Sequence, residues 1–454
     1  MSFTSKFVNI YKALLPSPFT IAIVLSFFAF VLALLFGMGV ENEFKPYTIL
    51  TYWENGIWNP NLLVFTVQMI LMLVLGHILA ISAPVNQFIN SVTQHLNTSA
   101  KAAAWITFLT MLVAFFNWGL GLIFGAIMAR KLAEESLRNN WRLNYPLIAA
   151  GGYSGLMVWH GGFSGSSLAK VAESGHLVSL LPIKLHSSIP DAISFSETVF
   201  SRMNMTTSFA LLIIAPMAMY WMGKKSKAPP ITLNTKFRTP QKPIIVGAEK
   251  LDHSKGLGIV VGAILILYVL YKMFWVIGFT HYFTPNNINL LLLGMGFLFH
   301  KNLYNFTQAL DQAISGAAGI LIQFPLYFGI MGILRDSQLI AQFSEFVAQS
   351  ASPNSLTYFT FFSAGIVNIL VPSGGGQWAI QGPILLQTAT EMGAPLAKNI
   401  LAFAYGDQLT NMLQPFWALP LLGITGLKAK DILPYSLFLF LIGLPIFLVM
   451  LFLF

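Results

Sequence analysis

The sequence predicts an all-α polytopic membrane protein, and three observations lead to this prediction. Only 9% of the 454 residues are charged and 56% are hydrophobic, whereas about a quarter of an average soluble domain is charged. Uncharged stretches such as 18–40 and 432–454 reach the roughly 20 residues that a helix needs to cross a bilayer. Other apolar stretches are interrupted by Gly, Pro and polar residues, an irregularity that a membrane tolerates only inside protein or along a cavity. A soluble enzyme, a nucleic-acid-binding protein and a disordered scaffold are therefore excluded.

Uninterrupted apolar runs predict the simple membrane spans. The basic N-terminus and its apolar run resemble a signal peptide, but the run is too long and lacks a small-residue cleavage site, so we expect an uncleaved first span. The chain has no Cys, which excludes disulfides and thiolate metal sites. The expected spans are Phe19–Gly37, Asn61–Ile81, Met203–Met222, Leu257–Phe279, Asn286–His300, Gln308–Leu334 and Ile432–Phe454.

Four further apolar stretches are interrupted. Ala103–Arg130 and Ser355–Pro383 have polar, glycine-rich centres, and we expect each to be a re-entrant hairpin. Pro146–Ala169 and Ala397–Gly423 contain scattered Gly, Ser, Gln and Pro, and we expect each to be a broken helix. Such interruptions at bilayer depth are typical of sites where a membrane protein handles polar cargo.

The distribution of charge orients these segments. Segment 223–256 contains eight basic and two acidic residues and four prolines, which predicts a solvated cytoplasmic linker. The other basic loops fall on the same side of the membrane only if the first hairpin enters from the cytoplasm and the second from outside. The net charge of +9 is therefore explained by cytoplasmic loops rather than by nucleic-acid binding.

The predicted segments form an internal repeat. Residues 1–222 and 280–454 each contain two spans, a hairpin, a broken helix and a final span, and the connecting span 257–279 inverts the second half relative to the first. Inverted repeats with interrupted helices are typical of secondary transporters. A purely structural bundle is the alternative, but it leaves irregular backbone at bilayer depth without a reason.

The hairpin turns provide the first candidate binding residues. A helix that begins at mid-membrane presents free amides and a positive dipole end to a carboxylate, and a preceding helix end presents carbonyls to a cation. Close packing is the alternative reading, and it is favoured for Gly121, which forms a GxxxG pattern with Gly125. The candidates are Asn117, Gly119 and Gly121 in the first turn, and Asn368, Ser373, Gly374, Gly375 and Gly376 in the second.

The broken helices provide Ser164 in the first half and Asp407, Gln408 and Asn411 in the second. Asp407 is the acidic residue that we expect deep in the membrane, where a lone charge costs several kcal/mol unless it is paired or protonated. It therefore predicts a proton or Na⁺ site, and the alternative is a carboxyl neutralised by local hydrogen bonds.

His77 and His160 are expected to be packing residues without an acidic partner. Neither a Walker A loop nor an HExxH motif is present, so ATP-driven pumping and a resident metal are not expected.

Several blocks of sequence match a known family. They are Asn117–Leu122, Gly161–Ser166, Val371–Trp378, Ile380–Pro383 and Gln414–Pro420. On these blocks the chain resembles the AtoE family of short-chain fatty acid transporters, which are bacterial inner-membrane proteins. Asp407 stands where relatives often have Glu and so keeps the carboxyl, whereas Gln377 stands where some relatives have His.

The resemblance implies an elevator-type ion-transporter fold, often dimeric, that moves small monocarboxylates such as butyrate or acetoacetate with H⁺ or Na⁺. A small monocarboxylate, membrane lipid and a second copy of the chain are the expected partners, and neither nucleic acid nor an organic cofactor is expected. A carrier for another small organic anion and a passive anion channel remain as alternatives. An enzyme is not expected, because the sequence contains no catalytic constellation.

Overall fold

The computed structural model describes residues 16–38, 45–93, 95–181, 183–226, 228–229, 231, 247–279, 282 and 284–454. Every regular element in these ranges is a helix, and seven of those helices are long and apolar enough to cross a membrane. The multi-pass all-α architecture predicted from composition is therefore confirmed. The seven are α2 (Pro18–Phe36), α4 (Pro60–Ile81), α6 (Ser99–Phe116), α11 (Arg202–Lys225), α13 (Lys255–Tyr271) with its π-helical end to Val276, α16 (Ala318–Asp336) and α22 (Ala429–Leu453).

Four shorter helices were not expected from the sequence. Each is amphipathic rather than apolar on all sides, so a search for apolar runs misses it. They are α3 (Lys45–Ile57), α5 (Ala83–Thr93), α15 (Leu303–Ala313) and α17 (Leu339–Ser350). The predicted span Gln308–Leu334 is wrong as a single helix, because a 3-10 turn at Ile314–Ala317 separates α15 from α16. The short predicted span near 286–300 corresponds to α14 (Pro285–His300).

Both predicted hairpins are pairs of packed helices, and the second arm of each runs past the predicted end. The first consists of α6 and α7 (Trp118–Arg138), and the second of α18 (Leu356–Leu370) and α19 (Gly374–Glu391). The α7 arm continues past Arg130 because its charged end is amphipathic and carries an i,i+4 ion pair between Arg130 and Glu134 at 3.0 Å. The re-entrant path of both hairpins stays a prediction, since α6 is long enough to cross a membrane.

Both interrupted spans lose their α-helical geometry near the middle. The first contains α8 (Tyr145–Tyr153), 3-10 turns at Ser154–Met157 and Trp159–Gly161, and α9 (Ser166–Val171). The second contains α20 (Leu396–Thr410), a 3-10 turn at Asn411–Leu413, and α21 (Leu419–Thr425). The remaining short elements are α10 (His176–Ser179), the 3-10 turn Ile183–Ser188, and α12 (Glu249–Asp252).

The two halves of the chain contain the same order of elements. In each, an apolar helix, a short amphipathic helix, a second apolar helix, another short helix, a hairpin, a broken helix and a final long helix follow one another, as α2–α11 and as α14–α22. The four unpredicted short helices thus occupy matching places. The opposite orientation of the halves remains a prediction, and most of the predicted linker 223–256 lies outside the described residues.

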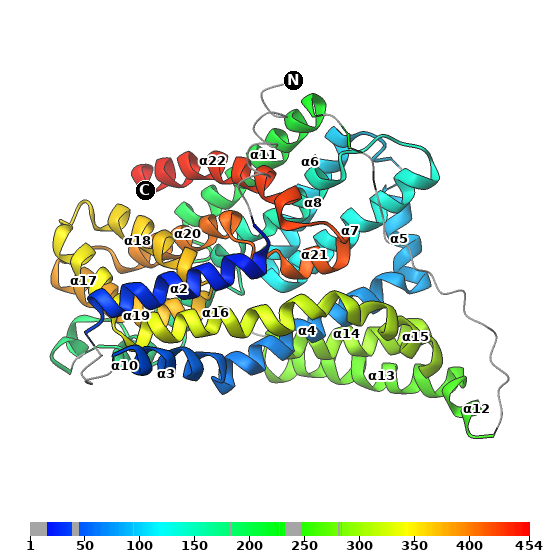
Figure 1. Cartoon of the computed structure of the whole chain (residues 1–454), viewed down its shortest axis with the longest axis horizontal. Coiled ribbons are helices and arrows are strands. Elements are labelled where there is room, and N and C mark those ends of the chain that lie inside the picture. Colours follow the sequence, from blue (N-terminus) through cyan, green and yellow to red (C-terminus); the bar gives the residue numbers. More distant parts are fainter. Residues whose placement is uncertain are drawn as a thin grey trace.

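The helices separate into two groups by their packing (Figure 1). We call α2, α3, α4 and α13–α16 the frame: α2, α3 and α4 pack on α16, and α13 and α15 join through α14 and α4. We call α6–α9, α11 and α17–α22 the hairpin unit, in which α6 packs on α11 and α8, α18 packs on α20, and α22 packs on α8 and α11. The frame meets the hairpin unit where α4 contacts α7, where α4, α16 and the turn before α16 contact α21, and where α16 contacts α17. Helix α5 belongs to neither group and contacts α7 on one side and α4 and α14 on the other.

Small residues allow the close approach of helices within the hairpin unit. A Cβ atom added to Gly125 of α7 would lie 2.7 Å from both the Cα atom of Gly152 and the hydroxyl oxygen of Thr110. Membrane helices associate through such contacts because lipid gives them no hydrophobic drive to pack.

We therefore expect Gly125→Ala to lower the thermal stability of the detergent-solubilised protein by an amount corresponding to about 1–3 kcal/mol, the usual cost of overpacking. Gly319→Ala in α16 is the matched control, because the nearest atom to its added Cβ is 3.4 Å away, at Gln323. Fluorescence-detected size-exclusion melting curves measure both. Equal melting temperatures for the two variants would contradict the close-packing role of Gly125.

Candidate functional site

Each hairpin turns at a residue that caps the following helix. Asn117 ends α6 in extended conformation, and its side-chain oxygen accepts a hydrogen bond from the amide of Leu120 at 2.9 Å. Ser373 plays the same part for α19, where its hydroxyl accepts from the amide of Gly376 at 3.2 Å. The first amides of a helix have no acceptor within it. The turns thus place two positive helix ends inside the protein.

The two turns meet at the loop that interrupts the first broken helix. Ser164 in this loop accepts a hydrogen bond from the amide of Trp118 at 3.0 Å. From the other side, the Cβ position of Gly374 lies 3.1 Å from the Ser166 hydroxyl and 3.0 Å from the His160 ring. The starts of α7 and α19 therefore bracket the same short loop, although they come from different halves of the chain.

The second broken helix is held by amide side chains. The Asn368 Nδ2 atom lies 2.7 Å from the carbonyl of Asp407, 2.9 Å from the Thr410 hydroxyl and 2.8 Å from the Asn411 Oδ1 atom. In return, the side-chain amide of Gln414 donates to the carbonyl of Asn368 at 2.7 Å. These bonds fix the second hairpin against the point where α20 stops.

Asp407 lies beside His160 in the interior. The His160 Nδ1 and Asp407 Oδ1 atoms are 3.5 Å apart, and the two side chains are 0% and 1% exposed. This is an ion-pair distance without hydrogen-bond geometry, and Nδ1 of His160 and Oδ2 of Asp407 have no hydrogen-bond partner among the described residues. The expectation that His160 has no acidic partner is wrong, because the contact joins opposite halves of the chain and leaves no local sequence signal.

Gln408 ties the two breaks together. Its side-chain oxygen accepts hydrogen bonds from the amides of His160 at 2.9 Å and Gly161 at 3.3 Å. Among the described residues, no three His, Asp or Glu side chains come together in a way that could hold a metal ion.

An unusual number of buried polar atoms at this junction lack a hydrogen-bond partner within the described part of the chain. Buried polar groups are ordinarily paired, because leaving one unpaired costs about 1–3 kcal/mol. Their concentration here indicates a place for a polar ligand. They are Trp159 Nε1, His160 Nδ1, Asn368 Oδ1, Gln377 Oε1, Asp407 Oδ2, Asn411 Nδ2, Gln414 Oε1 and Trp417 Nε1.

The structure brings most of the predicted site residues together and separates two from the others. Gly119 and Gly121 face protein, because their added Cβ atoms would meet Met72 and Ala114, respectively. Packing accounts for both positions. The residues at the junction are Asn117, Ser164, Asn368, Ser373, Gly374, Gly375, Gly376, Asp407, Gln408 and Asn411.

An aromatic cluster that sequence reasoning did not identify adjoins the junction. The ring of Trp118 lies 4.9 Å from that of Trp417 and 5.8 Å from that of Trp159, and Phe65 and Phe416 border the group. Each of the three tryptophans follows or lies within an interrupted stretch, which is the one signal that could have singled them out.

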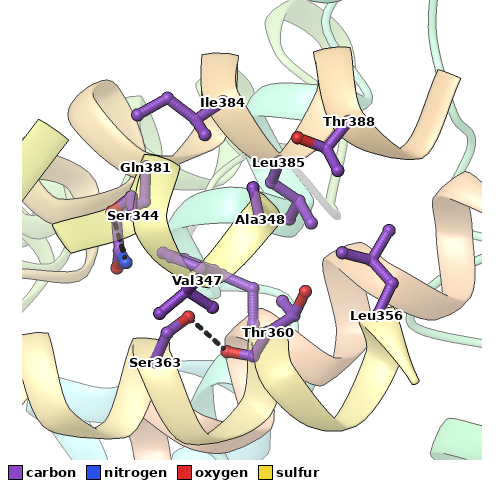
Figure 2. Close-up of a pocket in the computed structure, with 11 residues that line it drawn as sticks. Ser344, Val347, Ala348, Leu356, Thr360, Ser363, Gln381, Ile384, Leu385 and Thr388 are labelled. Atoms are coloured by element: carbon purple, nitrogen blue, oxygen red, sulfur yellow. Dashed lines mark hydrogen bonds between the residues drawn. The ribbon is translucent and has the colours of Figure 1, made fainter. Parts of the chain in front are cut away.

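A separate small pocket opens behind the second hairpin (Figure 2). It lies among α17, α18, α19 and α20 and combines aliphatic side chains with hydroxyls and the amide of Gln381. None of the residues predicted to bind a ligand lines it. Phe403 connects the two regions, because it lines the pocket and its ring centroid lies 6.4 Å from that of His160.

The whole chain, residues 1–454, matches the profile of a family described as "Short chain fatty acid transporter". The chain belongs to this family. It is 35% identical over 462 residues to a protein of Escherichia coli (strain K12), covering 98% of both chains. It is also 35% identical over 457 residues to a protein of Haemophilus influenzae, covering 98% of this chain and 97% of that one. Both relatives are named "Putative short-chain fatty acid transporter", so the family is one of transporters rather than enzymes.

Two solved transporter structures also align with most of this chain. Neisseria gonorrhoeae MtrF, from a class of antimetabolite efflux pumps, is 13% identical with a TM-score of 0.39, covering 99% of this chain and 97% of its own. The Alcanivorax borkumensis YdaH transporter is 13% identical with a TM-score of 0.41, covering 95% of this chain and 98% of its own.

One contact beside the site is sensitive to pH. The indole Nε1 of Trp378 donates to the Nε2 atom of His176 at 3.1 Å, so His176 must be unprotonated on that atom. Burial, followed by the positive charge of Lys170, lowers the pKa of His176 from its ordinary 6.5, while Glu173 acts in the opposite direction. The contribution of the neutral His176 ring to folding stability is therefore complete above pH 6.5. It is lost as the pH falls through the lowered pKa of the folded state.

We expect His176→Phe to remove about 1 kcal/mol of stability at pH 7.5 and to flatten the dependence of melting temperature on pH between 7.5 and 5. His253→Phe is the control, because His253 is half-buried in a loop and stacks on Tyr304 instead. If His176→Phe retains the full wild-type slope, the Trp378 contact does not cause it.

Proposed function

We propose that this protein is a secondary active transporter of short-chain fatty acids, such as butyrate or acetoacetate, across the bacterial cytoplasmic membrane, driven by H⁺ or Na⁺. The observation that carries the proposal is the buried junction where the starts of α7 and α19 meet unpaired polar atoms of both broken helices. Helix N-termini and amide side chains bind an anion without a formal positive charge. The names of the family and of its relatives support the substrate class.

A site of this chemistry favours one carboxylate over two. Apart from Asp407 and the titratable ring of His160, the side chains that meet at the junction are uncharged. A second carboxylate would be desolvated without a countercharge, at a cost of several kcal/mol. Small monocarboxylates therefore fit better than dicarboxylates.

The coupling ion would bind at Asp407. Its Oδ2 atom and the acceptor oxygens of Asn368 and Gln414 lack donors among the described residues, which suits Na⁺. His160, 3.5 Å from the carboxylate, suits a shared proton instead. Either cation offsets the substrate charge, and an uncompensated charge moves against the membrane potential at about 2.3 kcal/mol per 100 mV.

The division into frame and hairpin unit suggests how the site reaches both sides. We propose that the hairpins are re-entrant from opposite sides and that the hairpin unit moves against the frame as an elevator. Because the natural chain has no Cys, a single Gly375→Cys variant can be labelled with a membrane-impermeant thiol reagent from each side in turn. Labelling from one side only, whichever direction the ion gradient has, would contradict the alternating exposure. A homodimer stays a prediction.

Counterflow of labelled butyrate in proteoliposomes tests the function. A carrier exchanges external label for internal unlabelled butyrate, whereas a passive channel equilibrates without trans-stimulation. Competition by unlabelled monocarboxylates of increasing length, and by other organic anions, separates this substrate class from that of a different anion carrier. The absence of butyrate exchange by the wild-type protein would refute the proposal.

The second hairpin should tolerate a side chain at Gly375 but lose its ligand. An added Cβ there meets only the Ser166 Cβ atom, at 4.0 Å, so the protein itself has room. We expect Gly375→Val to fold with near-wild-type stability and to reduce butyrate exchange at least tenfold, because the valine occupies the approach to the α19 N-terminus. Gly319→Ala, in the frame, should exchange normally. Normal exchange by Gly375→Val would mean that the ligand does not approach this turn.

Asp407→Asn keeps the size of the side chain but removes its charge. We expect this variant to abolish uptake driven by an ion gradient while retaining part of the butyrate exchange, since exchange needs no net ion movement. Varying Na⁺ at fixed pH, and then pH at fixed Na⁺, identifies the ion in the wild type. Asp311→Asn in α15 of the frame is the control. Accumulation of butyrate against a gradient by Asp407→Asn would show that the carboxylate is structural.

A further inference from the structure

Two tryptophans at the junction have buried indole N–H groups without an acceptor. Trp159 starts the 3-10 turn that interrupts the first broken helix, and Trp417 lies in the non-helical stretch before α21. Their side chains belong to residues that are 2% and 4% exposed, and neither Nε1 atom has a partner among the described residues. Indole can only donate, and a buried indole N–H usually finds an acceptor. Two exceptions in one place therefore point to a missing acceptor.

Both indoles lie where the helix starts converge. Their ring centroids are 6.3 Å apart, and the ring of Trp118, the first residue of α7, contacts both. Trp159 stacks on His160 at 4.3 Å, and its Cη2 atom lies 3.1 Å from the Cβ position of Gly374 at the start of α19. The pair thus occupies matching interruptions of the two halves and borders both hairpin turns.

We infer that the indole N–H groups of Trp159 and Trp417 donate hydrogen bonds to the carboxylate of the transported monocarboxylate. The inference rests on the proposed function and names two of the side chains that hold the anion. Neutral donors suit a moving site, because an Arg or Lys in their place would add a charge that crosses the bilayer with the substrate. They also leave Asp407 with its own cation rather than with a permanent basic partner.

Phenylalanine variants test this directly, because they keep an aromatic ring and remove only the N–H donor. A hydrogen bond to a charged group contributes about 1.5–3 kcal/mol, so we expect Trp159→Phe and Trp417→Phe each to raise the half-saturating butyrate concentration in counterflow at least tenfold. Trp53→Phe is the matched control: its Nε1 is also buried without an acceptor, but it packs on Gly329 between α3 and α16. It should exchange like the wild type.

A spectroscopic measurement covers the case in which a variant folds poorly. With ¹⁵N-labelled indoles in nanodiscs, butyrate should shift the N–H resonances of Trp159 and Trp417 and leave that of Trp53 in place, and uncharged butyramide should shift them much less. If wild-type protein exchanges butyrate but these resonances do not respond, the inference is overturned and the proposed function stands. If wild-type protein exchanges no butyrate, both fail together.

Discussion

Non-helical backbone inside an apolar interior must find hydrogen-bond partners, and the rest of this structure depends on how that requirement is met. In lipid no water can serve, and each break forms hydrogen bonds with a side chain of the opposite half as well as with its own. The hydroxyl oxygen of Tyr153 lies 2.7 Å from the carbonyl oxygen of Asn411 and 2.9 Å from that of Gln414. In the opposite direction, the side-chain oxygen of Gln408 accepts hydrogen bonds from two backbone amides of the first broken helix.

The contacts that hold the two breaks are therefore nearly the same as those of the proposed binding site. The amide side chains at the second break use one end to hold it, and the other end is left over: Asn368 Oδ1, Gln414 Oε1 and Asn411 Nδ2 have no partner in the described structure. A ligand that completes these bonds would stabilise the junction as it binds. Because these unpaired amide donors and acceptors can bind a ligand, the proposed substrate site needs no Lys or Arg.

Close helix packing permits the arrangement. Gly406 of α20 lies against the Phe361 carbonyl of α18, and Gly152 of α8 lies against Gly125 of α7. Each hairpin thus packs closely on the broken helix of its own half. Its turn, at the end of the hairpin, contacts the other half. In the frame, Gly56 and Gly332 bring α3 and α16 together in the same way, so small residues set the spacing in both groups of helices.

Hydropathy, charge and turn chemistry act over a few neighbouring residues, and the sequence by itself determined everything that depends on them. It fixed the all-helical membrane class, most of the spans, the turns at Asn117 and Ser373, and Asp407 as a buried carboxyl. It did not reveal the amphipathic helices α3, α5, α15 and α17, whose one-sided apolar faces depend on what packs against them. Packing between the halves alone decided that His160 meets Asp407 and that Trp159 and Trp417 lie in one aromatic cluster. Such contacts join residues far apart in the chain, and no local pattern records them.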